Sequence, residues 1–229
     1  MEMSMGLGLA KLCTPKKSGS SFAKLLLHLD SDFSDSSILN NPPTLIGGAV
    51  TIDTTRAVFG AGSLKGVSNG RVQYPGSADW KIRSGTPFQV SWRMWLNNFN
   101  TEYWFLGNQS SSGSTGFFFI IKSSGTVFRI RIQGFNNNIS HNFATGQWNA
   151  YRVNHDGAGN YRFFVDGILI DTIVISSGSD ASTPLNIGAS YSNTSGLSGN
   201  LDEILWEQGS NLIITTANYT VETTVFPDP

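Results

Sequence analysis

Hydrophobic and polar residues alternate strictly along two segments of the chain. Between residues 88 and 96 the apolar positions are Phe88, Val90, Trp92, Met94 and Leu96. Between residues 128 and 132, apolar positions enclose Arg129 and Arg131. A period of two is typical of a β-strand that buries one face. We therefore predict two half-buried strands, and the residues expected between two packed layers are Trp92, Met94, Phe128, Ile130, Phe163 and Val165.

Further segments are predicted as strands on the same grounds. Residues 115–122 are apolar on both faces, as expected for a central strand, and residues 148–155 and 161–165 follow. Asp166 and Gly167 stand between two apolar runs, and this pair predicts a hairpin because both turn residues take positive φ. No amphipathic helix is longer than two turns. Many short strands separated by turns indicate a two-sheet β-sandwich.

Composition narrows the class of partner. Only 14% of the 229 residues are charged and the net charge is −1, so the chain lacks the basic surplus that binds a phosphate backbone. We therefore expect no nucleic-acid partner. No apolar run approaches the roughly 20 residues that span a bilayer, so we expect no membrane insertion. The single cysteine, Cys13, excludes an internal disulfide.

The two ends of the chain differ from its middle. Residues 1–21 are rich in Gly, Ser and Lys and are expected to form an extended N-terminal arm or linker, either a disordered leader or a docking arm. This start has no basic region and a very short apolar stretch, so it does not have the pattern of a signal peptide. We expect the sandwich to span residues 22–217, with a C-terminal tail, residues 218–229, packing on it.

Several short motifs occur in a characteristic order. They read Phe-Val-Asp-Gly at 164–167, Pro-Leu-Asn-Ile-Gly at 184–188 and Gly-Asn-Leu-Asp-Glu-Ile at 199–204, with Gly-Gln-Trp-Asn at 146–149 upstream. Over roughly residues 25–214 the chain thereby resembles the laminin-G-like, concanavalin A-like lectin and glucanase domains. The resemblance implies an all-β fold, a two-sheet antiparallel jelly-roll sandwich. Domains of this kind usually bind and only sometimes catalyse.

The sequence lacks the carboxylate pattern expected of a glycan-cleaving enzyme of this architecture. Glycan-cleaving enzymes of this architecture carry a Glu-x-Asp-x-x-Glu pattern on one strand, which places two carboxylates on one face. Here Asn200 and Leu205 replace the outer acids, which leaves Asp202 beside Glu203. We expect structural roles for both acids and for His28, and no enzymatic activity. A glycan-cleaving enzyme with atypically placed carboxylates is kept as an alternative hypothesis, ranked after the two binding and structural roles described below.

A metal site is a weaker candidate. Asp30, Asp32 and Asp35 offer hard oxygen ligands within six residues, and Ca²⁺ is the ion that such ligands suit. Asp and Ser residues at this spacing also cap their own turns, which is the alternative reading.

Aromatic residues among polar neighbours are the candidates for carbohydrate binding. Trp95 falls on the polar face of its predicted strand, next to Arg93. Trp104, Tyr191 and Asn136 fall at predicted strand ends or loops, where binding groups gather. Aromatic rings stack on sugars while planar polar groups bond the hydroxyls. The alternative is that these rings cover sheet edges or contact another subunit.

The C-terminal ending, Tyr-Thr at 219–220 and Phe-Pro-Asp at 226–228, resembles that of phage-encoded members of the family. The resemblance implies a non-enzymatic virion structural protein, displayed outside the particle and attaching it to a host-surface glycan. The alternative is a capsid or tail decoration protein that makes only protein contacts. We expect other virion proteins to contact residues 1–21, with the chain present as a homo-oligomer or in many copies. Its location would be the virion, after synthesis in the host cytoplasm.

Overall fold

The computed structural model describes residues 20–48, 50–66, 69–82, 85–99, 102–109, 115–122, 125–132, 135–175, 181–192 and 195–229. The expected arm, residues 1–21, lies outside these ranges except for its last two residues. No helix within the described ranges is long and apolar enough to cross a membrane.

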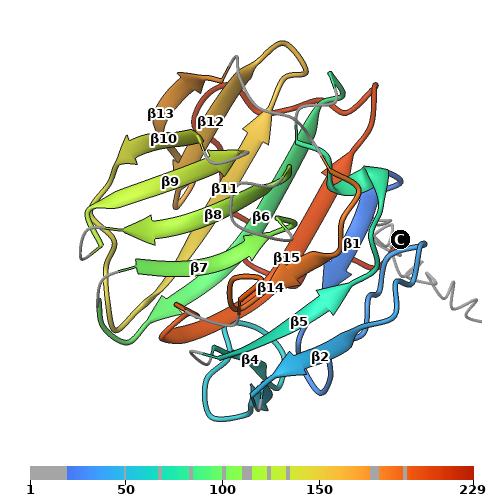
Figure 1. The fold of residues 1–229 in the computed structure, drawn as a ribbon, viewed down its shortest axis with the longest axis vertical. Helices are drawn as coiled ribbons and strands as arrows, with labels where there is room; N and C mark the ends of the chain where they lie inside the picture. The colour runs from blue at the N-terminus through green and yellow to red at the C-terminus, as the bar shows by residue number, and fades with distance from the viewer. Residues whose placement is uncertain are drawn as a thin grey trace, which may run out of the picture.

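The described strands form two antiparallel sheets packed face to face (Figure 1). In order across the first sheet, its strands are β13 (Ile168–Val174), β12 (Asn160–Val165), β11 (Trp148–His155), β6 (Phe88–Leu96), β15 (Gly199–Gln208), β4 (Ser63–Lys65) and β3 (Thr51–Asp53), with β1 (Ala23–Leu27) also paired to β15. The second sheet comprises β10 (Phe135–Ser140), β9 (Val127–Ile132), β8 (Phe117–Lys122), β7 (Glu102–Gly107), β14 (Leu185–Ile187), β5 (Gly70–Tyr74) and β2 (Thr44–Gly47). The one helical element among the described residues is the short 3-10 turn η1 (Ala78–Trp80). The predicted all-β jelly-roll sandwich is confirmed.

The core lies between the sheets and is strongly aromatic. All six residues predicted from alternation are buried in it. Trp92 of the first sheet stacks on Tyr151 at 5.7 Å and on Phe119 of the second sheet at 6.0 Å. Phe128 and Phe163 lie 4.1 Å apart with their rings 4° from parallel, which joins the two layers directly. Rings in such contact add stabilisation beyond the area that they bury.

The hairpin predicted at Asp166 and Gly167 joins β12 to β13. Their φ values are +49° and +78°, as the tight turn requires. The Asp166 carboxylate accepts from the backbone N–H of Ala150 at 2.8 Å and from the Asn149 side chain at 2.7 Å, which ties the turn to β11.

The C-terminal segment, which we define as residues 215–229, crosses the outer face of the first sheet without forming a strand. Its carbonyl at Thr215 accepts from the Asn154 side chain at 2.7 Å. Further on, the N–H of Tyr219 donates to the carbonyl of Gly167 at 2.9 Å. The segment therefore covers side chains on strands far from it in the sequence.

Candidate functional site

The outer face of the first sheet is unusually polar. The core-facing residues of β6 alternate with outward ones, and strand register carries that face across to β11 and β15. Three neighbouring rows of outward residues read Asn154, Gln89 and Glu207; Arg152, Ser91 and Leu205; and Ala150, Arg93 and Asp202. Because the C-terminal segment lies over this face, several of these polar side chains are buried.

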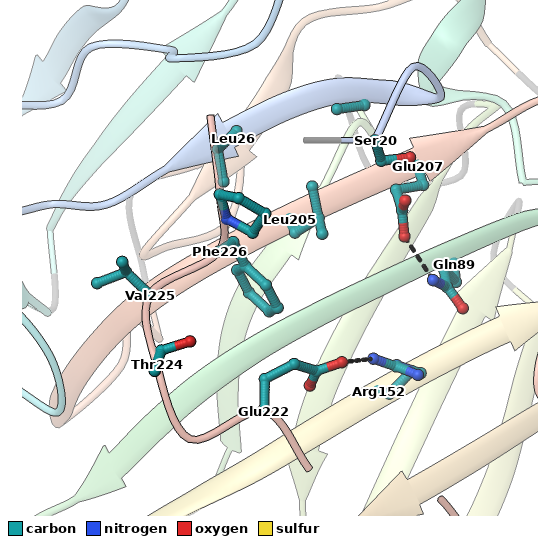
Figure 2. Close-up of a pocket in the computed structure, with 12 residues that line it drawn as sticks. Ser20, Leu26, Gln89, Arg152, Leu205, Glu207, Glu222, Thr224, Val225 and Phe226 are labelled. Carbon is teal, nitrogen blue, oxygen red and sulfur yellow. Dashed lines mark hydrogen bonds and ion pairs between the residues drawn. The ribbon is translucent and has the colours of Figure 1, made fainter. Parts of the chain in front are cut away.

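A pocket of about 340 Å³ opens on this face between β1 and the C-terminal segment. Figure 2 shows its walls: the ring of Phe226 points from the C-terminal segment into a group of side chains, with Leu205 and Glu207 above it in this view and Glu222 and Arg152 below it. The planar polar side chains that line it are Gln89, Arg152, Glu207 and Glu222, and the hydroxyl residues Ser20 and Thr224 line it as well. A small aromatic surface is thus surrounded by planar polar groups.

Gln89 and Glu207 form one polar wall of the pocket. The Gln89 amide nitrogen donates to the Glu207 carboxylate, and the dashed line on the right of Figure 2 marks this bond. The Gln89 amide oxygen is buried and has no hydrogen-bond partner among the described residues. A buried acceptor without a partner costs about 1–3 kcal/mol, so a ligand donor at this position would be favoured.

Arg152 and Glu222 form the opposite wall. The Arg152 guanidinium lies 3.2 Å from a Glu222 carboxylate oxygen and donates to the Ser91 hydroxyl at 2.8 Å. The same guanidinium lies 4.0 Å over the ring of Tyr219. Three contacts hold Arg152 in place, and two of them come from the C-terminal segment. The wall therefore exists only while that segment is docked.

A charged clasp holds the far end of the C-terminal segment. His28 Nδ1 lies 3.1 Å from a Glu203 carboxylate oxygen, and His28 Nε2 lies 3.0 Å from Asp228. The hydrogen bond to the buried Glu203 carboxylate is the main reason that the pKa of His28 is raised to about 9. Glu203 also accepts from the backbone N–H of Phe226 at 2.9 Å. The clasp thus fixes the aromatic residue of the pocket.

The adjacent acids of β15, Asp202 and Glu203, have the predicted structural roles, because both carboxylates accept hydrogen bonds from backbone N–H groups. Glu203 has a φ of +48°, at an irregularity in the pairing of β15 with β6. Asp202 is completely buried and accepts from the N–H of Val58 at 2.9 Å and from that of Glu203 at 2.9 Å. Burial raises the pKa of Asp202 to about 7. The Asn200 side chain donates to Asp53 and so is also engaged within the chain.

The predicted calcium ligands do not converge on a metal site. The Asp35 carboxylate accepts five hydrogen bonds, from the N–H of Leu26 and from backbone and side-chain groups of Ser37 and Asn41. Asp32 accepts from its own turn, and Asp30 from the N–H of Ala61 at 2.7 Å. Among the residues that the structure describes, no three acidic, His or Cys side chains are grouped to hold a metal ion. These hydrogen bonds favour the interpretation that the three acids cap turns, and calcium binding stays a prediction.

Trp95 lies on the outer face of the first sheet, as alternation predicted, and is half-buried. It is six residues further along β6 than Gln89, roughly 20 Å from the pocket at the rise of a strand. The Arg56 guanidinium lies 4.5 Å over its ring, and the Trp148 ring meets it at 6.1 Å and 66°. Carbohydrate binding by Trp95 stays a prediction.

The other four predicted carbohydrate residues divide between the two sheets. Arg93 is covered by the C-terminal segment and donates to the carbonyl of Glu222, which corrects the expectation of an exposed donor. Trp104 and Asn136 share the outer face of the second sheet. Tyr191 belongs to the loop after β14, and this loop contacts β7, where Ser195 accepts from the N–H of Trp104 at 2.8 Å. Trp95 and Trp104 therefore cannot hold one small ligand together.

Sequence reasoning missed the pocket. Its residues Glu207, Glu222 and Phe226 come from β15 and the C-terminal segment and carry no motif that marks them as a group. The alternation of residues 88–96 places Gln89 on a polar position, and Arg152 falls on the predicted strand 148–155. That signal could have nominated the face, but not the segment that completes the pocket.

The fold is a two-sheet jelly-roll sandwich with a pocket on the outer face of its first sheet. The sequence of residues 68–209 matches the family model described as the concanavalin A-like lectin/glucanases superfamily, of the Laminin_G_3 type. The chain belongs to this family. No curated protein matches its sequence.

Solved structures show the same fold at low sequence identity. Domain 4 of AbnA, an extracellular arabinanase from Geobacillus stearothermophilus solved in complex with arabinotriose, is similar at a TM-score of 0.66 and 14% identity, over 82% of this chain and 92% of that one. Botulinum neurotoxin type C, which interacts with two ganglioside molecules, is similar at a TM-score of 0.60 and 15% identity, over 81% of this chain and 47% of that one. The binding domain of Paraclostridial Mosquitocidal Protein 1 gives a TM-score of 0.64 at 15% identity, over 81% and 48%. The chain spans about half the length of these two toxin chains.

Proposed function

We propose that this chain is a non-enzymatic glycan-binding domain and that the pocket beneath the C-terminal segment receives the sugar. The observation that carries the proposal is the pocket itself, where the ring of Phe226 and four planar polar side chains surround about 340 Å³. Pockets for small ligands start at roughly this size. The chemistry suits a saccharide, whose C–H faces pack on a ring while its hydroxyls bond carboxylate, amide and guanidinium groups.

The structural relatives agree with this class of function. One was solved with arabinotriose bound, and another interacts with gangliosides. At identities of 14–15% these likenesses extend to the fold, and the ligand-binding residues must come from this chain. The pocket supplies such residues without any counterpart of the glucanase carboxylate pattern.

The finer part of the proposal is display on the outside of a phage particle, with host attachment as the task. It rests on the resemblance of the C-terminal ending to phage-encoded members of the family. A single shallow sugar site binds weakly, and many copies on one particle would raise the overall avidity by orders of magnitude. The alternative is a decoration protein, whose neighbours in the particle would cover the pocket.

The test is a glycan array probed with the multimerised protein, followed by calorimetric titration of the best neutral saccharide. Glu207→Gln keeps the shape of the pocket and removes one charge, and we expect it to weaken binding by about tenfold, the loss of one charge-assisted hydrogen bond. Asp171→Asn, on the exposed edge strand β13, is the matched control and should bind as the wild type does. Retained affinity in Glu207→Gln would refute the pocket as the site, and an array without signal would favour the decoration protein.

Incubating the array hit with the protein and separating the products tests the enzymatic alternative. We expect the saccharide to remain intact, because each pocket carboxylate is already paired, one with Gln89 and the other with Arg152. Cleavage that disappears in Glu207→Gln would instead establish a hydrolase with atypical carboxylates.

A further inference from the structure

The outer face of the second sheet carries a second cluster of aromatic, cationic and amide groups. Strand register places Trp104, Ile120, Arg129 and Asn138 in one row across four strands. The next row contains Phe118, Arg131 and Asn136. All of these alternate with core residues, so they share the face that looks away from the first sheet. At a strand spacing of about 4.8 Å the longer row measures roughly 14 Å.

A ring contact and a cation–π contact lie at the centre of this face. The Trp104 ring packs on Phe118 at 5.2 Å with the two rings tilted by 60°, and the Arg131 guanidinium lies 5.1 Å from the centre of the Trp104 ring. The Trp104 indole N–H donates to Glu102. Trp104 is only half-buried although Phe118 beneath it is completely buried. A cation–π contact of this kind holds the guanidinium near the ring, where its N–H groups can also bind a planar partner.

The charges on this face are unbalanced. Lys122 and Glu102 neutralise each other in an ion pair at 3.1 Å. Arg129 uses its Nε to donate to the Asn138 amide oxygen at 2.7 Å, which orients the guanidinium without neutralising it. Among the described residues, no carboxylate lies within ion-pair distance of Arg129 or Arg131. Two positive charges, two residues apart on one strand, therefore remain on a face with an aromatic ring.

Arg131 has a second property that points to a ligand. Its Nε is buried and has no hydrogen-bond partner among the described residues. Buried donors are almost always paired in folded proteins, and one that is not calls for an explanation such as an absent ligand. A carboxylate is the partner that a guanidinium binds most strongly, through two parallel hydrogen bonds.

We propose that this face is a second binding site and that its ligand is an acidic saccharide, one that carries a carboxylate. Arg131 and Arg129 receive the carboxylate, the Trp104 ring supports a sugar face, and the exposed amides of Asn136 and Asn138 bond the hydroxyls. The site is on the opposite sheet from the Phe226 pocket and does not depend on it. The two also differ in charge, because the pocket has Glu207 and Glu222 against a single Arg152.

The test compares matched acidic and neutral ligands. The probes are a short oligogalacturonide and its methyl ester, which has the same rings without the charge, and 3′-sialyllactose against lactose. We expect the acid of at least one pair to bind tenfold or more tightly than its neutral counterpart, with affinity falling as salt rises. The two pairs separate a uronic acid from a sialic acid as the source of the carboxylate.

Variants assign the binding to this face. Arg131→Gln should weaken binding of the acidic ligand at least tenfold, and Arg131→Lys should restore only part of it, because Lys retains the charge but not the planar fork. Lys65→Gln, at an exposed position of the first sheet, is the control for loss of one positive charge. Glu207→Gln should leave acidic-ligand binding unchanged, so failure of the pocket and failure of this site give different results. Equal affinity for the acidic ligand and its neutral counterpart in both pairs, or full binding by Arg131→Gln, would overturn the proposal.

Discussion

Replacing His28 by Gln should remove a pH-dependent part of the stability. In the folded chain the pKa of His28 is about 9, against 6.5 for an unperturbed histidine, because Glu203 and Asp228 favour the protonated ring. A raised pKa in the folded state stabilises the fold fully below about pH 6.5, and this contribution is lost as the pH rises through about 9. Wild-type stability should therefore fall across this window.

The magnitude follows from the shift. The pKa rises from 6.5 to about 9, and at about 1.4 kcal/mol for each pKa unit this sets an upper value of roughly 3 kcal/mol. Glu203 is only 1% exposed, so solvent hardly screens its stabilisation of the protonated His28 ring. Asp228 is 65% exposed, so solvent screens most of its contribution. We therefore expect about 2–3 kcal/mol.

The assay is urea unfolding followed by tryptophan fluorescence at half-unit steps from pH 6 to 10. His28→Gln should be less stable than the wild type by about 2–3 kcal/mol at pH 6.5, and the two should converge near pH 9.5. His141→Gln is the matched control: burial lowers the pKa of His141, so its titration in the folded chain falls below this window. A difference between wild type and His28→Gln that stays constant with pH would refute the clasp as the cause.

Three shorter predictions test other parts of the structure. Phe163→Ala removes a ring stacked 4.1 Å from Phe128 and should lower the free energy of unfolding by about 3–5 kcal/mol, a loss below 1 kcal/mol being inconsistent with the packed core. Gly167→Ala places a Cβ 2.1 Å from the Tyr219 carbonyl oxygen, at a residue whose φ is +78°. The C-terminal segment should then detach more often, and its amide hydrogens should exchange faster. Unchanged exchange there would argue against the docked arrangement. Asp35→Ala should lower the free energy of unfolding by about 3 kcal/mol, because its turn loses several hydrogen bonds. Adding Ca²⁺ or a chelator should leave the melting temperature of the wild type unchanged. A calcium-dependent rise in melting temperature that Asp35→Ala abolishes would instead support a metal site.

Much of the architecture could be predicted from local pattern. Alternating side chains of a strand point to opposite faces, so the pattern around Trp92 and Ile130 predicts that both face the core, and both are buried there. The turn at Asp166 and Gly167 was predictable because so few residue pairs accept two positive φ values. These features are properties of short segments, so a single sequence contains them.

The candidate sites were less predictable because they depend on contacts between distant segments. Alternation placed Trp95 on the outward face of its strand, whereas Trp104 was expected at a strand end or in a loop and lies within β7. Neither pattern carries information on which sheet a strand joins. Arg93 looked exposed because its cover comes from Glu222, 129 residues later in the chain. The position of Phe226 likewise depends on a distant contact, the hydrogen bond from its backbone N–H to Glu203, 23 residues before it.

The most direct test of the central claim is an amide chemical-shift map of the labelled protein during titration with the neutral saccharide selected on the array. The account predicts that the shifts which saturate with the ligand cluster at Leu26, Gln89 and Arg152 and in the C-terminal segment around Phe226. The same titration of Glu207→Gln should need about ten times more ligand to reach equal shifts. Saturating shifts confined to residues around Trp95, or none at concentrations where the array gave signal, would contradict the pocket as the sugar site.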